Sequence, residues 1–255
     1  MRPRIIPVLL VQDQGLVKTV KFSNGKYIGD PINAINLFNE MEVDELIVMD
    51  ISATRQGRGP DLCHIEECCG EAFMPIGYVG GVTSVSQYER LFNIGVEKIG
   101  INSAFRKNPE LIQEASRLFG SQSVVAVIDV KKTLMGKYKV YDYSTGKTEA
   151  TDLQEHLDHI QHLGAGEIVI YSVDQDGAMG GYDLQLVSEI SKSVSVPLVI
   201  CGGADSISSM VEVIKHGADA AGAGSIFVYS RTKTKGVLIN YPTQEELIEA
   251  FGEVT

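Results

Sequence analysis

Asp129 is the side chain whose type and position best fit general acid–base chemistry. It ends the apolar run Val124–Asp129, and a carboxylate at the carboxyl end of a barrel strand is typical of a catalytic residue. A role in capping or bonding the following loop is the alternative. Three other carboxylates follow apolar runs at similar heights and are candidates for a substrate site: Asp50, Asp174 and Asp176.

Two glycine pairs, each with a polar residue at the next strand end, have the pattern of phosphate-binding loops. Paired glycines let backbone amides approach a phosphate closely, and a neighbouring hydroxyl adds a donor. Because the pattern occurs twice, it predicts two phosphate sites and an elongated ligand with a phosphate at each end. The residues are Gly80, Gly81, Asn102 and Ser103 in the first site, and Gly202, Gly203, Gly224 and Ser225 in the second.

The carboxylate that would complete an acid–base pair with Asp129 is missing. Aligning the runs Ile5–Leu10 and Val124–Asp129 places Leu10 opposite Asp129. Leucine can neither donate nor accept a proton, so it cannot take part in general acid–base catalysis. The nearest carboxylate, Asp13, is already in the following loop.

Four charged residues stand at or near the starts of apolar runs: Arg4, Glu45, Lys98 and Glu167. Any one of them alone would be interpreted as a solvated charge at a strand end. Since two are positive and two negative, the four could instead meet as a salt-bridged ring that closes the floor of a barrel.

The elements that must position these residues are short apolar runs alternating with helical stretches. Continuous apolar runs are typical of parallel strands buried on both faces. Eight such strands are expected: Ile5–Leu10, Glu45–Asp50, Pro75–Val79, Lys98–Asn102, Val124–Asp129, Glu167–Ser172, Pro197–Cys201 and Asp219–Gly224.

An internal repeat relates the two halves of the chain. Glu45, Gly81 and Ser103 lie in segments that recur 122 residues later, at Glu167, Gly203 and Ser225. A constant offset indicates one half-barrel used twice. The sequence therefore predicts a single α/β domain over residues 1–255, with half-barrels at about 1–122 and 123–240 and a C-terminal helix at 243–252.

Composition excludes several classes of partner. The net charge of −11 argues against nucleic acid and anionic membranes, and no apolar run is long enough to span a membrane. The four cysteines lack the Cys-x-x-Cys spacing of a zinc site and are interpreted as free thiols in a reducing cytosol. We expect a cytoplasmic protein with no metal, no cofactor and a phosphorylated small-molecule ligand.

The motifs resemble those of the HisF family, the cyclase subunit of imidazole glycerol phosphate synthase. The resemblance covers about residues 2–230 and implies a (β/α)₈ (TIM) barrel of the ribulose-phosphate-binding type. The matching segments are Arg4-Ile-Ile, Asp44-Glu-Leu, Gly80-Gly81, Ile101-Asn-Ser-Ala, Phe119-Gly-Ser-Gln-Ser-Val-Val, Ala126-Val-Ile-Asp129, Gly164-Ala-Gly-Glu, Asp174-Gln-Asp-Gly-Ala-Met-Gly-Gly-Tyr-Asp183 and Gly202-Gly203-Ala.

The resemblance also implies roles for the residues above. In the family, a HisH-type glutaminase docks on the barrel floor, and its ammonia passes a charged gate and crosses the barrel. The ammonia reaches a ribulosyl-aminoimidazole substrate phosphorylated at both ends, which yields imidazole glycerol phosphate. By this resemblance Asp129 is one of two catalytic aspartates, the glycine-rich loops bind phosphate, and the gate is Arg4, Glu45, Lys98 and Glu167.

The departures from the family pattern indicate a specialised member. The other catalytic aspartate maps to Leu10, Val79 displaces the third glycine of the first phosphate loop, and the segment at 236–242 also differs. This combination resembles HisF-like paralogues that accompany amidotransferases in surface-polysaccharide synthesis and are associated with acetamidino sugars.

Three functions are compatible with these residues. The first is an ammonia-relaying subunit, with a HisH-type glutaminase as partner and a sugar amidotransferase as a further candidate partner. The second is a true cyclase of histidine synthesis, in which Asp13 or another group covers for Leu10. The third is the related phosphoribosyl isomerase, which shares the duplicated barrel but needs no ammonia gate.

Overall fold

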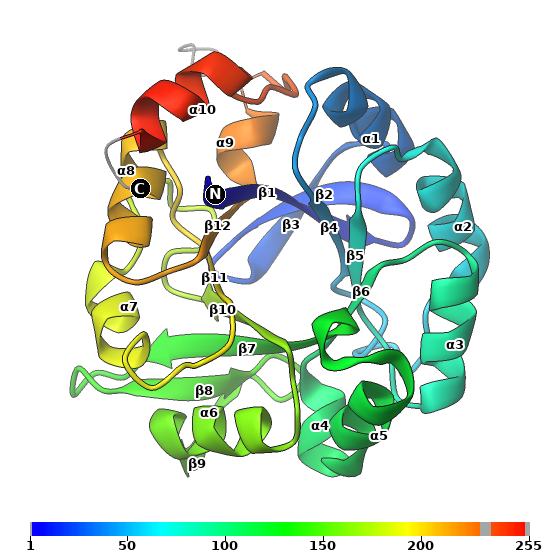
Figure 1. Cartoon of the computed structure of the whole chain (residues 1–255), viewed down its shortest axis with the longest axis vertical. Coiled ribbons are helices and arrows are strands. Elements are labelled where there is room, and N and C mark those ends of the chain that lie inside the picture. The colour runs from blue at the N-terminus through cyan, green and yellow to red at the C-terminus, as the bar shows by residue number, and fades with distance from the viewer. Residues whose placement is uncertain (1, 230–235, 253–255) are drawn as a thin grey trace.

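A closed barrel of parallel strands forms the centre of the computed structural model, which describes residues 2–229 and 236–252 (Figure 1). Pairing of β12 with β1 and of β7 with β10 closes the cylinder, which confirms the expected (β/α)₈ fold. In order around the barrel, the strands are β1 (Arg4–Gln12), β4 (Leu46–Asp50), β5 (Ile76–Val79), β6 (Lys98–Ile101), β7 (Val124–Lys132), β10 (Glu167–Ser172), β11 (Leu198–Cys201) and β12 (Ala220–Ala223).

Helices surround the barrel, and the first of them begins at a capping aspartate. Before the first helix, the Asp30 carboxylate accepts a hydrogen bond from the backbone N–H of Ile32 at 2.7 Å, and Pro31 occupies the first helical position. No described helix has the length and apolarity needed to cross a membrane. The helices are α1 (Pro31–Glu40), α2 (Leu62–Glu71), α3 (Val85–Asn93), α4 (Ser103–Lys107), α5 (Glu110–Phe119), η1 (Ser121–Ser123), α6 (Leu153–His162), α7 (Leu184–Ile190), α8 (Ile207–Lys215), α9 (Ser225–Val228) and α10 (Gln244–Phe251).

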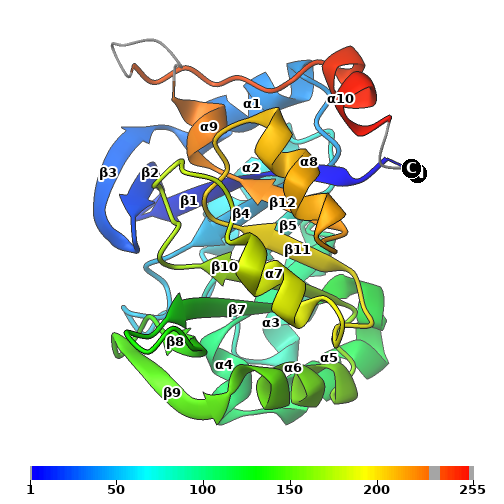
Figure 2. The same ribbon diagram turned by 90° about the vertical axis from the view of Figure 1, so that its left-hand side faces the viewer.

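Two antiparallel hairpins extend the barrel beyond the strands expected from the sequence. The hairpin of β2 (Gly15–Val20) and β3 (Ser23–Gly29) continues from β1. The hairpin of β8 (Tyr138–Asp142) and β9 (Lys147–Asp152) continues from β7. Both lie at the carboxyl end of the barrel strands, where a TIM barrel carries its site (Figure 2). The expected domain limits at residues 1 and 255 lie outside the described part of the chain.

The strand register relates Leu10 to Asp129. Leu10 is paired with Met49 of β4, and Asp129 is paired with Tyr171 of β10. Met49 and Tyr171 are themselves 122 positions apart, the offset of the repeat. Leu10 therefore holds, in the first half of the chain, the register position that Asp129 holds in the second.

The inside of the barrel is apolar between its two ends. Side chains from the barrel strands, together with Val17 of β2, fill it as a compact cluster that is separate from the core between the strands and the helices. The members of the inner cluster are Ile6, Val8, Leu10, Val17, Ile47, Val79, Val125, Val127, Val169, Tyr171, Val199, Cys201 and Ala220.

Candidate functional site

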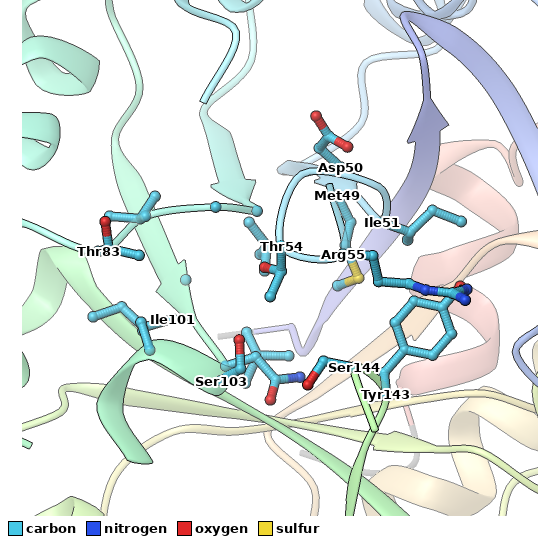
Figure 3. A pocket seen from close by; sticks show the side chains of 18 of the residues that line it. Met49, Asp50, Ile51, Thr54, Arg55, Thr83, Ile101, Ser103, Tyr143 and Ser144 are labelled. Atoms are coloured by element: carbon cyan, nitrogen blue, oxygen red, sulfur yellow. The ribbon is translucent and has the colours of Figure 1, made fainter. Parts of the chain in front are cut away.

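A cavity of about 310 Å³ opens at the carboxyl ends of β4, β5, β6 and β7 (Figure 3). We call it the larger cavity. The first expected phosphate site lies in its wall, and Val79 lines it without filling it. Of the residues expected from the sequence, it brings together Asp50, Gly80, Gly81, Asn102, Ser103 and Asp129.

Asp129 is buried in the wall of the larger cavity, with 5% of its surface exposed. Burial raises the pKa of its carboxyl to about 7, although a hydrogen bond from Asn102 and the charge of Arg106 act in the opposite direction. The Asn102 amide nitrogen lies 2.8 Å from the Asp129 Oδ2 atom. A carboxyl group with a pKa near neutrality can both donate and accept a proton at physiological pH.

The second set of glycines lines a separate, nearly filled cavity of about 20 Å³, which we call the smaller cavity. Gly203 has a φ of +106°, and an added Cβ atom would lie 2.1 Å from the Gly181 carbonyl oxygen, so this position requires glycine. Leu10 lines the smaller cavity and not the larger one. The lining residues expected from the sequence are Leu10, Asp176, Gly202, Gly203, Gly224 and Ser225.

Lys18 of β2 lines the smaller cavity. Its ammonium group donates to the Val8 carbonyl oxygen at 2.9 Å and lies 2.3 Å from where a Cβ atom on Gly224 would be. Burial lowers the pKa of Lys18 to about 8, although the charge of Asp176 acts to raise it. Sequence reasoning missed this residue; its only signal is a lysine within the apolar run Leu16–Val20.

Inorganic phosphate should therefore bind beside Lys18. This buried ammonium has no carboxylate within 4.0 Å among the described residues, so an anion on the adjacent glycine loops would compensate its charge. We expect phosphate to raise the melting temperature of the wild type more than that of Lys18→Met, which keeps only the phosphate loop of the larger cavity. The control is Lys26→Met, an exposed lysine on β3. Equal stabilisation of both variants would contradict the prediction.

The other candidate carboxylates are engaged within the protein. Asp50 binds its own loop and forms an ion pair with Arg58 at 2.8 Å. Asp174 accepts from the backbone N–H of Lys132 at 2.8 Å and lines neither cavity. Asp13, the alternative to the missing carboxylate, is exposed, accepts from Gln56 at 2.8 Å and also lines neither cavity.

Asp176 fastens the β2–β3 hairpin over the barrel mouth. Its Oδ2 atom accepts from the Thr19 hydroxyl at 2.7 Å and from the Phe22 backbone N–H at 3.0 Å. The Phe22 ring then packs edge-on against Tyr171, with the ring centroids 5.2 Å apart. Phe22 lines the larger cavity and Tyr171 the smaller one, and the two cavities have no lining residue in common. This aromatic pair separates them.

At the opposite end of the barrel, the four charged residues at the strand starts form a closed ring of ion pairs. The guanidinium of Arg4 lies 2.5 Å from Glu45 and 2.6 Å from Glu167, and the ammonium of Lys98 lies 3.0 and 3.1 Å from the same two residues. Burial alone would lower the pKa of Arg4, but the charges of Glu167 and Glu45 outweigh it and raise that pKa.

A void of about 10 Å³ lies between this ring and the larger cavity, and we call it the floor cavity. It is about large enough for one water-sized molecule. Glu45, Lys98 and Glu167 line its lower end. Its other lining residues are apolar or glycine, apart from Tyr78, and four of them also line the larger cavity: Met49, Val79, Gly100 and Val127.

Comparison with known proteins identifies the family. The model of the family described as "Histidine biosynthesis protein" matches residues 4–233. The chain is 46% identical over 253 residues to "Putative imidazole glycerol phosphate synthase subunit hisF3" of Vibrio vulnificus, covering 98% of this chain and 97% of the relative. It is 39% identical over 235 residues to "Imidazole glycerol phosphate synthase subunit HisF" of Bacillus cereus, covering 92% and 93%. The chain belongs to the HisF family of histidine biosynthesis proteins.

Proposed function

We propose that this barrel receives ammonia at its floor from a HisH-type glutaminase subunit and relays it toward the larger cavity, in a system that forms acetamidino sugars. The observation that carries the proposal is a complete ring of ion pairs at the floor together with Leu10 in the position of a catalytic carboxylate. A relay needs the ring but does not need the second carboxylate.

The free energy needed to bury the charged ring supports a role beyond stability. Glu45 and Glu167 are each only 4% exposed, and burying charged side chains is expensive even when they are paired. An apolar floor of the same size would hold the barrel together at lower cost. The floor cavity is lined by three residues of the ring and shares four lining residues with the larger cavity, so the path proposed for a small neutral molecule such as ammonia runs between apolar side chains.

Replacing Lys98 with methionine tests the relay. The change removes two of the four ion pairs and leaves Arg4 bonded to both glutamates, so we expect the barrel to remain folded. In the complex reconstituted with the glutaminase and an acetamidino-sugar synthase, the rate of product formation from glutamine should fall about tenfold or more. Formation from ammonium salts should change little, because free ammonia can enter at the barrel mouth.

The matched control is Lys137→Met, an exposed lysine at the other end of the barrel, which should leave both activities unchanged. Thermal melting of each variant gives the structural readout. If Lys98→Met lowers both activities together and the melting temperature collapses, the ring has a structural role only, and the relay proposal fails.

A true cyclase of histidine synthesis is the second candidate. It is favoured by Asp129, whose pKa of about 7 suits proton transfer, and by the 39% identity to a relative named as an imidazole glycerol phosphate synthase subunit. Against it, the position of the second carboxylate holds Leu10, and Asp13 lines neither cavity. A phosphoribosyl isomerase ranks third because it has no use for the floor ring.

The proposed setting is the cytosol. The net charge of −11 opposes binding to nucleic acid or to anionic membranes, and the four cysteines are free thiols in the structure. We expect no cofactor, and the partners are the glutaminase subunit, the sugar amidotransferase and a phosphorylated small molecule.

A further inference from the structure

Arg55 places a cation on the wall of the larger cavity without a carboxylate partner. Its guanidinium donates to the Tyr143 hydroxyl at 3.2 Å, and its Cζ atom lies 5.0 Å from the centroid of the Tyr143 ring. Figure 3 shows the two side chains next to each other on one side of the cavity. No acidic side chain lies within 4.0 Å of Arg55 in the described parts of the chain.

The loop that carries Arg55 is fixed against the first phosphate loop. Arg58 ties it down through Asp50 at 2.8 Å and the Ser52 hydroxyl at 2.8 Å. Gly81 has a φ of +67°, and an added Cβ atom would lie 2.7 Å from the Arg58 carbonyl oxygen, so the two loops are in close contact. The position of Arg55 relative to Gly81 is therefore set by packing and ion pairing.

Two of the other three cations that line the larger cavity have carboxylate partners. Arg58 is paired with Asp50, and Arg106 is paired with Asp142 at 3.3 Å and Glu149 at 3.0 Å. Lys107 is the second lining cation with no carboxylate within 4.0 Å among the described residues. On a protein with a net charge of −11, two uncompensated cations at one cavity favour a ligand with more than one negative charge.

We propose that the larger cavity binds a compact, sugar-sized ligand with two anionic groups: a phosphate on the loop of Gly80, Gly81 and Ser103, and a second anion at Arg55. Both anions would then lie on the same side of the Phe22–Tyr171 pair, in contrast to a ligand with one phosphate in each half of the barrel. The inference rests on the proposed function, because it names the ligand class of the cavity toward which the relay leads.

The sizes of the two cavities support a ligand confined to one of them. The larger cavity, at about 310 Å³, has room for a phosphorylated sugar. The smaller cavity, at about 20 Å³, has room for little more than a single anion beside Lys18. The ring of Phe22, held by Asp176, lies between them.

A matched pair of open-chain sugar phosphates tests the second anion. Both 6-phosphogluconate and sorbitol 6-phosphate have six carbons and one phosphate, and only the first has a carboxylate at the other end. Titration calorimetry on the isolated barrel should show 6-phosphogluconate binding about tenfold or more tightly than sorbitol 6-phosphate, as expected for a hydrogen bond between charged groups. Arg55→Gln should abolish this preference and leave the affinity for sorbitol 6-phosphate unchanged.

Arg90→Gln is the matched control, because Arg90 is an exposed arginine on α3 that lines neither cavity, and it should keep the preference. Equal affinity of the wild type for the two sugar phosphates, or no binding of either, would overturn the inference. Equal weakening of both by Arg55→Gln would also overturn it, since Arg55 would then support the cavity without selecting the anion. The assay needs neither glutaminase nor ammonia, so its outcome is separate from that of Lys98→Met.

Discussion

Supplied with ammonium salts at high pH and the doubly phosphorylated substrate of histidine synthesis, the barrel should form product about 10²–10⁴-fold more slowly than a HisF enzyme with two catalytic carboxylates. The reason is Leu10, which matches Asp129 in strand register but cannot transfer a proton. Steady-state product formation by the isolated barrel is the measurement. Turnover at the rate of an ordinary cyclase would contradict the expectation and favour the second candidate function.

Replacing Leu10 with aspartate tests the same explanation directly. Leu10→Asp should restore measurable cyclase turnover if the doubly phosphorylated substrate displaces the Phe22 ring and reaches both cavities. The ammonium of Lys18 lines the same cavity as residue 10 and would compensate the charge of the new carboxylate. Leu10→Asn is the control, since asparagine has nearly the same shape as aspartate but no ionisable proton. This variant should stay inactive. If the aspartate variant also stays inactive while folded, the substrate pocket has diverged along with Leu10.

Asp129→Asn should stabilise the fold, and increasingly so as the pH rises. Burial raises the pKa of Asp129 from 3.8 to about 7 in the folded chain, so the folded state holds a proton that the unfolded state releases. The stability that Asp129 contributes to the wild type is therefore highest at low pH. It falls as the pH rises from the pKa of Asp129 in the unfolded chain to its pKa in the folded chain. The gain in the free energy of unfolding on substitution should therefore grow by roughly 2–3 kcal/mol between pH 5 and pH 8.

Urea denaturation of the wild type and the variant at both pH values gives this difference. Glu114→Gln is the control, because it removes an exposed negative charge on α5 and should show no comparable pH dependence. A gain for Asp129→Asn that is the same at pH 5 and pH 8 would mean that the carboxyl titrates normally in the folded protein. The buried environment would then not prepare it for proton transfer.

The barrel strands could be predicted from the sequence because their signal is local. Each run, such as Val124–Asp129, is apolar between its ends, since a parallel strand in a barrel is buried on both faces. The repeat added long-range information that one run alone does not contain. It placed Leu10 opposite Asp129, and the strand register of β1 and β7 agrees with that alignment.

The roles of Lys18, Phe22 and Arg55 could not be predicted in the same way, because they depend on contacts between segments far apart in the chain. Phe22 is positioned by Asp176, 154 residues away, and Arg55 by Tyr143, 88 residues away. The hairpins that carry Lys18 and Tyr143 have mixed polar and apolar residues, so no periodic pattern marks them as strands. The contacts that define the roles of Lys18, Phe22 and Arg55 form only when the folded barrel brings these segments together.

The Phe22–Tyr171 partition has a consequence for how this duplicated barrel can diverge. Cavities without a shared lining residue are expected to respond independently to mutation, so free-energy changes caused by substitutions in the two should add. Each cavity is lined by residues of both halves, so a change such as Leu10 in the smaller cavity could accumulate without penalising the larger cavity. A gene duplication fused into a single chain would in this way carry two sites that can change separately.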